Sequence, residues 1–453
     1  MAVQYFSPQT LLLTLSILLP LVRPFTVITS DSDVPSSALI DGPQPAFSTN
    51  QNGARTDPRE QEAVYEIMRA TGNDWATDIS DVCRGRWHGI ECMPDKENVQ
   101  HVVSLSFGAL SDDTAFPTCD PNRSYVSESI TKLPHLRTLF FFRCFSNNPG
   151  RIPTFLGQLG PTLQTLVLRD NGFVGPIPSE LGNLTRLRIL DLHKNNLNGS
   201  IPVSLGRLTG LMSLDLSWNK LTGSIPGLSF PPLNVLDLSQ NLLMGPIPSS
   251  IGGCQSLIKM DFSRNQLTGS IPDSISGLKD LILMDISYNR LSILLPATLK
   301  SLNSLQVLNL KGNPMATTSL PNNAFDGMRG LMFLILSNMN MHGSIPESIG
   351  RLSNLRVIYL DGNRFNGSIP NSFRNLRNLS ELRLNDNQLS GPIPLERETV
   401  WRMKRKLRLH NNSGLCYNPN SGFEDGLDPS FSSGIGSCIT PTPTPGSTRT
   451  VQP

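Results

Sequence analysis

A pattern of apolar and polar positions recurs along most of the chain, and residues 211–226 show it most completely. There the sequence reads L-x-x-L-x-L-x-x-N-x-L-x-G-x-I-P, with Leu214 and Leu216 two residues apart. Apolar residues at this spacing predict a short strand with one buried face. Asn219 predicts a turn, because its amide can bond backbone groups that leave the strand. One such unit cannot bury its own leucines, so the pattern predicts a stack of similar units.

The polar residue that ends the strand recurs about every 24 residues and forms what we call the asparagine ladder. The spacing shortens to 22 residues before Asn241 and lengthens to 26 before Met339, which lacks a side-chain amide. The ladder positions are Asn171, Asn195, Asn219, Asn241, Asn265, Asn289, Asn313, Met339, Asn363 and Asn387. This period is that of leucine-rich repeats. It predicts an α/β solenoid, a right-handed leucine-rich-repeat superhelix with disulfide-closed caps at both ends.

The N-terminal end of the stack needs a cover over its open core, and residues 59–101 are predicted to form it. Pro58 suits the first turn of a helix, and the apolar residues that follow fall on one helical face. Cys83 and Cys92 lie nine residues apart around a Trp and a Gly, which predicts a hairpin closed by a disulfide. The alternative, a zinc site, would need a second cysteine pair at matching spacing, and secreted thiols oxidise.

The other five cysteines have separate predicted roles. Cys144 takes the ladder position of an early, irregular repeat, either as a buried substitute or as the disulfide partner of Cys119. We favour the disulfide, because Cys119 is the nearest unpaired partner. Cys254 lies just before a strand and is predicted to be a buried, unpaired thiol. Cys416 and Cys438 are predicted to pair and to lock the C-terminal end.

The repeats are predicted over residues 102–401 and a C-terminal cap over 402–438. A basic run from Arg402 to Lys406 lies beside Trp401 at this boundary. It is either a binding patch or the solvated face of a capping helix, with Trp401 sealing the core. We favour the capping helix.

The ends of the chain indicate a secreted protein. Residues 1–24 have a Leu-rich core too short to span a bilayer and predict a signal peptide, with an N-terminal anchor as the alternative. Residues 25–58 lack periodicity and predict a flexible arm. Residues 439–453 are rich in Thr and Pro and predict an extended tail. Six N-x-S/T sequons predict glycosylation at Asn122, Asn183, Asn198, Asn366, Asn378 and Asn411.

Charge and motifs argue against several functions. A net charge of +2 with 16% charged residues gives no field suited to nucleic acid or an anionic membrane. The six histidines are scattered without metal-ligand spacing. The chain has no phosphate loop, nucleophile elbow or kinase signature. It is therefore predicted to be no enzyme and to bind no cofactor, metal or small-molecule substrate.

Function is predicted to lie on the variable residues of the strands, which point out of a concave sheet because strand side chains alternate. Aspartates recur at one of these positions, either as consensus filler or as a binding stripe. Trp218, Tyr288 and Tyr359 are stronger candidates, because exposed aromatic residues are favoured as interface anchors. The predicted protein- or peptide-binding residues are His193, Asp215, Trp218, Asp237, Asp261, Arg264, Asp285, Tyr288, Lys311, Tyr359, Asp361 and Arg383.

Segments outside the repeat consensus carry a closer resemblance. They are Ile40-Asp41-Gly42-Pro43-Gln44, the cap from Gly72 to Asp95, the insertion from Ser104 to Pro121, and the stretch from Leu379 to Leu407. Together with the G-x-I-P extension of the repeat, they resemble the plant leucine-rich-repeat receptor-like proteins of stomatal patterning. The resemblance covers nearly the whole chain.

The resemblance implies a receptor without a kinase domain at the outer face of the plasma membrane. Such a protein pairs with ERECTA-family receptor kinase ectodomains, and the complex recognises secreted cysteine-rich epidermal patterning peptides and limits or orients stomatal lineage divisions. Family members carry a C-terminal hydrophobic segment, which this chain lacks at Pro453, so we expect a truncated chain or a secreted form. The alternatives are a secreted inhibitor of pathogen cell-wall hydrolases and, less favoured, a structural wall protein.

Overall fold

The structure is a computed structural model that describes residues 55–85, 89–108, 117–227, 229–292, 296–313, 319–418 and 435–438. All of them belong to one compact unit, Ala54–Pro453. The predicted signal peptide, most of the predicted arm and the predicted tail lie outside the described residues. Their assignments therefore stay predictions.

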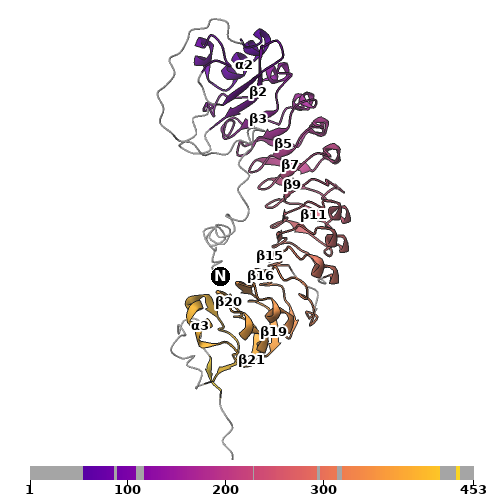
Figure 1. Cartoon of the computed structure of the whole chain (residues 1–453), viewed down its shortest axis with the longest axis vertical. Coiled ribbons are helices and arrows are strands. Elements are labelled where there is room, and N and C mark those ends of the chain that lie inside the picture. The colour runs from indigo at the N-terminus through magenta and orange to yellow at the C-terminus, as the bar shows by residue number, and fades with distance from the viewer. Residues whose placement is uncertain are drawn as a thin grey trace, which may run out of the picture. The chain divides into compact units, whose positions relative to one another are not determined.

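A 14-stranded sheet runs through the whole unit, and each repeat contributes one short strand to it (Figure 1). The first pair is antiparallel and all later neighbours are parallel. In order, the strands are β1 (Ile90–Pro94), β2 (Gln100–Phe107), β3 (Thr138–Phe141), β4 (Thr165–Val167), β6 (Ile189–Asp191), β8 (Ser213–Asp215), β10 (Val235–Asp237), β12 (Lys259–Asp261), β14 (Leu283–Asp285), β15 (Val307–Asn309), β16 (Phe333–Ile335), β18 (Val357–Tyr359), β20 (Glu381–Arg383) and β22 (Leu407–Arg408).

The strands stack in register, so equivalent residues of successive repeats lie side by side. Leu214 aligns with Leu236, and Leu236 aligns with Met260. All three are buried in the same continuous apolar core. Since successive strand residues point to opposite faces, the residues that flank these three point away from the core. The predicted leucine-rich-repeat solenoid is confirmed.

On the other side of most repeats the chain forms a short 3₁₀ helix. Most of these helices directly follow a proline. Their five or six residues are too few for a stable α-helix. They are η2 (Glu128–Lys132), η3 (Thr154–Leu159), η4 (Ser179–Asn183), η5 (Val203–Arg207), η6 (Ser249–Gly253), η7 (Asp273–Gly277), η8 (Ala297–Ser301), η9 (Glu347–Arg351) and η10 (Asn371–Asn375).

Smaller parallel sheets pair the segments that follow the asparagine ladder. One contains β5 (Val174–Pro176), β7 (Asn196–Ser200) and β9 (Lys220–Thr222). A second contains β11 (Met244–Gly245) and β13 (Gln266–Leu267). The third contains β17 (His342–Gly343), β19 (Arg364–Gly367), β21 (Gln388–Pro392), β23 (Gly414–Tyr417) and β24 (Gly436–Ser437).

The asparagine ladder joins each repeat to the one before it. The side-chain Oδ1 of Asn219 accepts from the Leu197 N–H at 3.0 Å, and its Nδ2 donates to the carbonyl of Leu192 at 3.0 Å and of Leu216 at 3.1 Å. These backbone groups would otherwise be buried without partners. At Met339, which is fully buried, the ladder lacks this amide, and the Met339 N–H instead donates to Asn363 Oδ1 at 3.0 Å.

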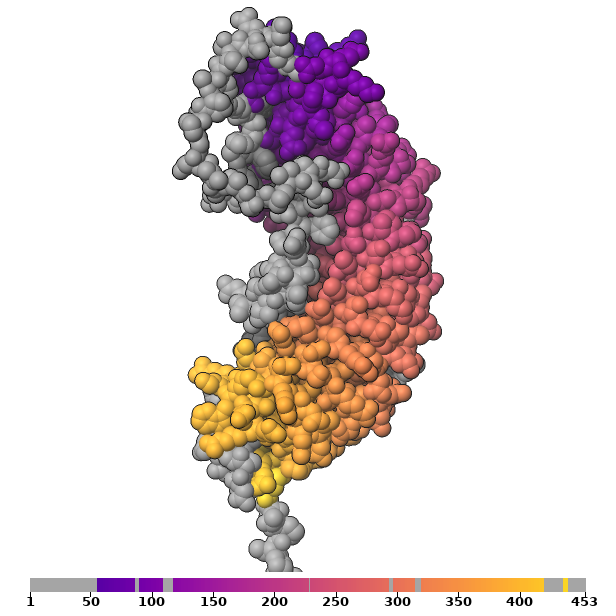
Figure 2. Space-filling view, viewed as in Figure 1, coloured from indigo at the N-terminus to yellow at the C-terminus, as the bar shows by residue number. Residues whose placement is uncertain are grey.

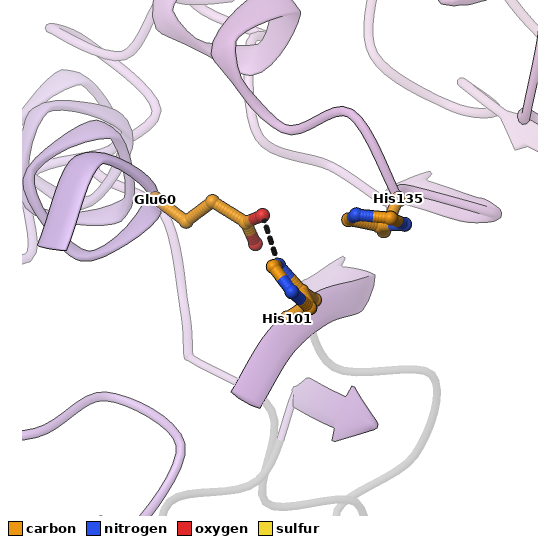
Figure 3. A group of neighbouring side chains, drawn as sticks. All are labelled: Glu60, His101 and His135. Atoms are coloured by element: carbon orange, nitrogen blue, oxygen red, sulfur yellow. Dashed lines mark hydrogen bonds and ion pairs between the residues drawn. The ribbon is translucent and has the colours of Figure 1, made fainter. Parts of the chain in front are cut away.

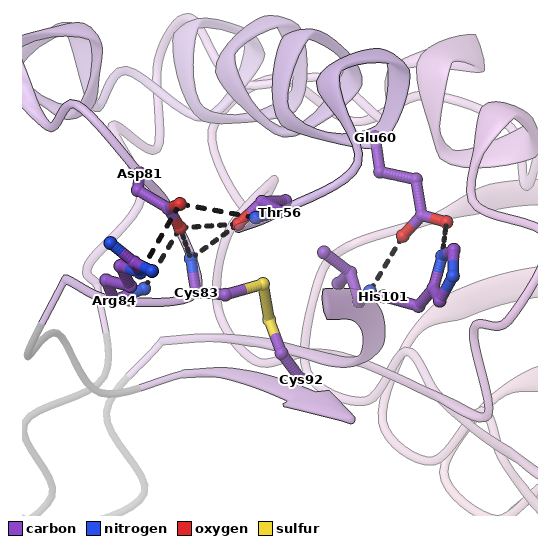
Figure 4. Close-up of a disulfide and its surroundings, with 8 residues drawn as sticks. Thr56, Glu60, Asp81, Cys83, Arg84, Cys92 and His101 are labelled. Carbon is purple, nitrogen blue, oxygen red and sulfur yellow. Dashed lines mark hydrogen bonds and ion pairs between the residues drawn. A yellow bond between two sulfur atoms is a disulfide. The ribbon is translucent and has the colours of Figure 1, made fainter. Parts of the chain in front are cut away.

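The N-terminal cap is built on helix α2 (Pro58–Ala70) and the short helix η1 (Asp74–Asp78). Asp57 caps α2 by accepting from the Arg59 N–H at 2.8 Å. The Thr56 hydroxyl donates to Asp81 at 2.5 Å, next to the Cys83–Cys92 disulfide (Figure 4). The last residues of the predicted arm are therefore part of the cap.

The C-terminal cap differs from the prediction in one respect. Helix α3 (Arg397–Met403) is followed by η11 (Lys404–Lys406), and Val400 and Met403 of α3 are buried. Trp401 does not seal the core: it is 45% exposed, with the Arg397 guanidinium 5.6 Å from its ring centroid. The helix turns residues three apart toward the core and leaves Trp401 outside. Strand β22 is the last strand of the large sheet and directly follows η11.

The remaining cysteines lie as the sequence predicts. Cys119 is bonded to Cys144, and Cys416 is bonded to Cys438 across β23 and β24. Cys254 is a buried free thiol whose Sγ accepts from the Phe230 N–H at 3.4 Å.

Candidate functional site: one face of the large sheet

The candidate site is the face of the large sheet that points away from the core, which we call the sheet face. It carries the third, fifth and seventh residues of each L-x-x-L-x-L-x-x-N unit, because strand side chains alternate. It also includes the eighth residue, since the Tyr288 ring at that position contacts Lys311 at the seventh. In the space-filling view the successive repeats form one continuous surface (Figure 2). The site is therefore a surface to which many repeats contribute.

The fifth positions align five carboxylates across neighbouring strands, and we call this row the aspartate column. The strand register places Asp191 beside Asp215, Asp215 beside Asp237, Asp237 beside Asp261, and Asp261 beside Asp285. Neighbouring strands are about 4.8 Å apart, so each carboxylate lies close to the next. At β15 the column ends, because Asn309 takes the position.

Four carboxyl groups of the aspartate column hold their protons more tightly than isolated carboxyl groups do, those of Asp191, Asp215, Asp261 and Asp285. Burial, and then the Asp285 and Asp237 carboxylates, raise the pKa of Asp261 to about 8. Burial and the neighbouring Asp215 raise the pKa of Asp191 to about 7. The pKa values of Asp215 and Asp285 are also raised, with burial as the largest cause. Desolvation and like charges both disfavour the ionised form.

Asp237 corrects one prediction, because it is buried rather than available to a partner. It is 7% exposed, and the Lys259 ammonium lies 2.8 Å from its Oδ2. The Ser239 hydroxyl donates to its Oδ1 at 2.7 Å. Lys259 occupies the third position of its repeat and was not among the predicted binding residues. The alternation of strand side chains places it on the same face.

The remaining aspartates accept hydrogen bonds within the face. The Ser217 hydroxyl donates to Asp215 Oδ1 at 2.6 Å, and His193 Nδ1 lies 2.9 Å from the Ser217 oxygen. Burial lowers the pKa of His193, against the opposing effect of Asp215. Asn309 Nδ2 donates to Asp285 Oδ2 at 2.7 Å. These buried and half-buried groups form a hydrogen-bonded floor to the face.

Two aromatic residues stand out from this floor. Trp218 is 54% exposed and Tyr288 is 40% exposed. Both occupy the position before the ladder asparagine, where the backbone is left-handed, with φ of 55° and 53°. Glycine takes this conformation without strain, as Gly312 and Gly362 do at the same position. An aromatic side chain is therefore not required by the turn.

Tyr288 is held among cations. The Arg264 guanidinium lies 4.5 Å from its ring centroid and the Lys311 ammonium 5.6 Å. A Cβ on Gly312 would meet the ring at 2.9 Å, so the glycine makes room for it. Cation–π contacts of this kind orient the ring and leave part of it exposed. Arg264 is itself exposed.

The C-terminal part of the face is more enclosed. Tyr359 is only half-buried rather than open, because the Arg383 guanidinium lies 4.1 Å from its ring centroid. Arg383 is in turn bound by Glu381 at 2.6 Å. Burial, together with nearby Glu381, raises the pKa of Tyr359. Asp361 accepts from the Ser337 hydroxyl at 2.6 Å.

The twelve predicted binding residues all lie on this side of the sheet, but their exposure differs. Trp218, Arg264 and Tyr288 are exposed, Asp237 is buried, and the others are intermediate. All six sequon asparagines are exposed, and their glycosylation stays a prediction. No helix among the described residues is both long and apolar enough to cross a membrane.

Known proteins share this architecture. Leucine rich repeat models match residues 161–221, 231–291 and 272–315, and another matches 354–376. The structure is similar to the plant peptide hormone receptor RGFR1 in complex with RGF2, with a TM-score of 0.60 and 32% identity over 67% of this chain and 48% of that one. It is also similar to PEPR1 with AtPEP1, with a TM-score of 0.59 and 27% identity over 79% and 52%. The chain thus spans about half the length of these receptors.

Two curated proteins of Arabidopsis thaliana extend the comparison. Receptor like protein 29 is 37% identical over 32% of this chain and 32% of its own length. Protein Too Many Mouths is 65% identical over 444 residues, which cover 98% of this chain and 89% of that protein. The chain therefore belongs to the plant leucine-rich-repeat receptor-like proteins, in the family of Too Many Mouths.

Proposed function

We propose that the chain is a non-catalytic co-receptor ectodomain at the outer face of the plasma membrane. It associates with ectodomains of ERECTA-family receptor kinases and shapes their recognition of secreted cysteine-rich patterning peptides, and so regulates stomatal lineage divisions. Its family membership and its similarity to receptors of plant peptides support this proposal.

The observation that carries the proposal is the pair of exposed aromatic residues on the sheet face. Trp218 and Tyr288 are 54% and 40% exposed, and the left-handed turn position that they occupy holds Asp170, Lys194 or Gln240 in other repeats, so the turn requires no aromatic residue. A bulky residue in the left-handed region costs about 1 kcal/mol or more. Partly exposed aromatic rings are the residues that most often anchor protein interfaces. Binding gives these side chains a role that folding does not.

The chemistry of the face also fits a polypeptide partner. Half-buried carboxyl groups lie on the same face, such as those of Asp215 and Asp285, and can accept hydrogen bonds from a backbone or from polar side chains. A partner of ordinary interface size would cover about 800 Å² of this surface. A small molecule would cover only a small part of it.

The proposal is tested by a pull-down of the secreted chain with ERECTA-family ectodomains, with and without a cysteine-rich patterning peptide. We expect a complex whose affinity for the peptide differs from that of the kinase ectodomain alone. A polygalacturonase inhibition assay on the same preparation tests the alternative function. Inhibition of the hydrolase without any complex would contradict the proposal.

A further inference from the structure

Three side chains from distant parts of the sequence meet at the N-terminal cap (Figure 3). Glu60 belongs to the first turn of α2, His101 lies on β2, and His135 lies between η2 and β3. One potential ligand atom of each residue lies within 4.8 Å of those of the other two. We propose that these three residues bind a divalent transition-metal ion of the zinc type.

The donor set has the chemistry that such an ion prefers. Zinc and copper take imidazole nitrogens and carboxylate oxygens, at about 2.0–2.2 Å for zinc. The Nδ1 of His101 lies 2.7 Å from Glu60 Oε1, and the rings of His101 and His135 have centroids 4.2 Å apart. Tetrahedral ligands lie about 3.4 Å apart, so the three atoms need to move by less than about 1 Å. The ion would replace the proton now shared by Glu60 and His101.

Each ligand is already oriented by neighbouring groups. The second oxygen of Glu60 accepts from the Val102 N–H at 2.7 Å, which leaves Oε1 directed at His101. His101 Nε2 lies 3.4 Å from Asp95 Oδ2, so Nε2 can carry the proton and leave Nδ1 for the ion. A carboxylate behind the ligating histidine is the usual arrangement in protein metal sites.

Asp95 and His135 are themselves fixed. Asp95 Oδ1 accepts from the N–H groups of Glu97 at 2.8 Å and Val99 at 2.9 Å. The chain next to His135 is bound to β2 by the Arg137 N–H, which donates to the Val103 carbonyl at 2.8 Å. Glu60 is buried and His135 is exposed, so the ion would reach the site from the His135 side. A solvent molecule there supplies a fourth ligand.

The bound ion would connect the cap helix to β2 and to the segment that precedes β3. An ion that binds only the folded chain stabilises it according to its concentration and affinity. Zinc should therefore raise the melting temperature of the chain. It should not do so after loss of a ligand.

The test is a calorimetric titration of the tag-free secreted chain with zinc chloride at pH 7.5, because zinc binds the deprotonated imidazole. We expect one zinc ion per chain. His135→Ala, which changes an exposed residue, should weaken binding at least about tenfold, and Asp95→Asn by about 10- to 100-fold. His342→Ala, on β17, is the matched control and should bind as the wild type does.

Two outcomes would overturn the proposal. One is the absence of saturable binding by the wild-type chain. The other is a His135→Ala affinity within twofold of the wild type. A parallel measurement of the melting temperature, with and without zinc, checks that each variant is folded.

Discussion

The aspartate column and the asparagine ladder are two rows of side chains that lie four residues apart in each repeat. Repetition has a different energetic effect on each row. In the asparagine ladder each amide is neutral, buried and bonded to backbone groups of two repeats, as at Asn219. In the aspartate column each carboxylate adds a charge beside the previous one, and the pKa of Asp261 is raised to about 8. A repeated neutral hydrogen-bonding group adds stability with every repeat. A repeated charge accumulates repulsion.

The structure limits this repulsion at two places. Lys259 binds Asp237 in the middle of the aspartate column, and Asn309 replaces the acid at its C-terminal end. The asparagine ladder therefore stabilises the fold, whereas the fold only tolerates the aspartate column. Residues that the fold only tolerates are free to serve binding.

The largest expected effect comes from breaking the asparagine ladder. Asn289→Ala removes the acceptor of the Leu267 N–H and a donor to the carbonyls of Phe262 and Ile286. Leaving these buried groups unpaired should lower the free energy of unfolding by about 3 kcal/mol. Chemical denaturation measures the loss. Arg290→Ala, at the neighbouring exposed position, is the control and should change stability little.

A smaller loss is expected when the cation of the aspartate column is removed. Lys259→Met leaves Asp237, whose side chain is 10% exposed, without its ion-pair partner. Breaking a partly solvated pair of this kind should cost about 2 kcal/mol. The double variant Lys259→Met/Asp237→Asn should recover most of the loss, because no buried charge is left. Equal stability of the single and double variants would contradict this account of Lys259.

Neutralising a carboxyl group of the aspartate column should raise the free energy of unfolding, and the size of this gain should depend on pH. The pKa of Asp261 is raised from 3.8 to about 8, so between these values the folded chain binds more protons than the unfolded chain. Stability therefore falls as pH rises through this range. Asp261→Asn should stabilise the chain by about 1 kcal/mol at pH 8, after solvent screening, and less at pH 5.

Melting temperatures at the two pH values measure this difference. Asp280→Asn is the control, because Asp280 is exposed and lies outside the column. A gain for Asp261→Asn that is the same at both pH values would show that ionisation of the Asp261 carboxyl group in the folded chain is not its cause.

The repetitive parts of the molecule were predictable from the sequence. The spacing of the ladder residues, combined with a parallel sheet, is enough to align Asp191 through Asp285 in one row. The disulfides followed from the secreted context and from the positions of the cysteines beside the repeats.

Features that depend on single side chains were not predictable. Burial of Asp237 depends on Lys259 of the next repeat, and exposure of Trp401 depends on which residues of α3 turn toward the core. The cluster of Glu60, His101 and His135 joins residues up to 75 positions apart. Its histidines seem scattered in sequence because the cap folds back on the first repeats.

Binding measurements are the most direct test of the central claim, that the sheet face binds a receptor kinase ectodomain through its exposed aromatic residues. Trp218→Ala and Tyr288→Ala are measured for affinity to an ERECTA-family ectodomain, beside Trp401→Ala, an exposed tryptophan outside the face. We expect each of the first two to weaken binding by more than about 1 kcal/mol, or roughly fivefold, and the third to leave it unchanged. Unchanged affinity for both Trp218→Ala and Tyr288→Ala would contradict the account.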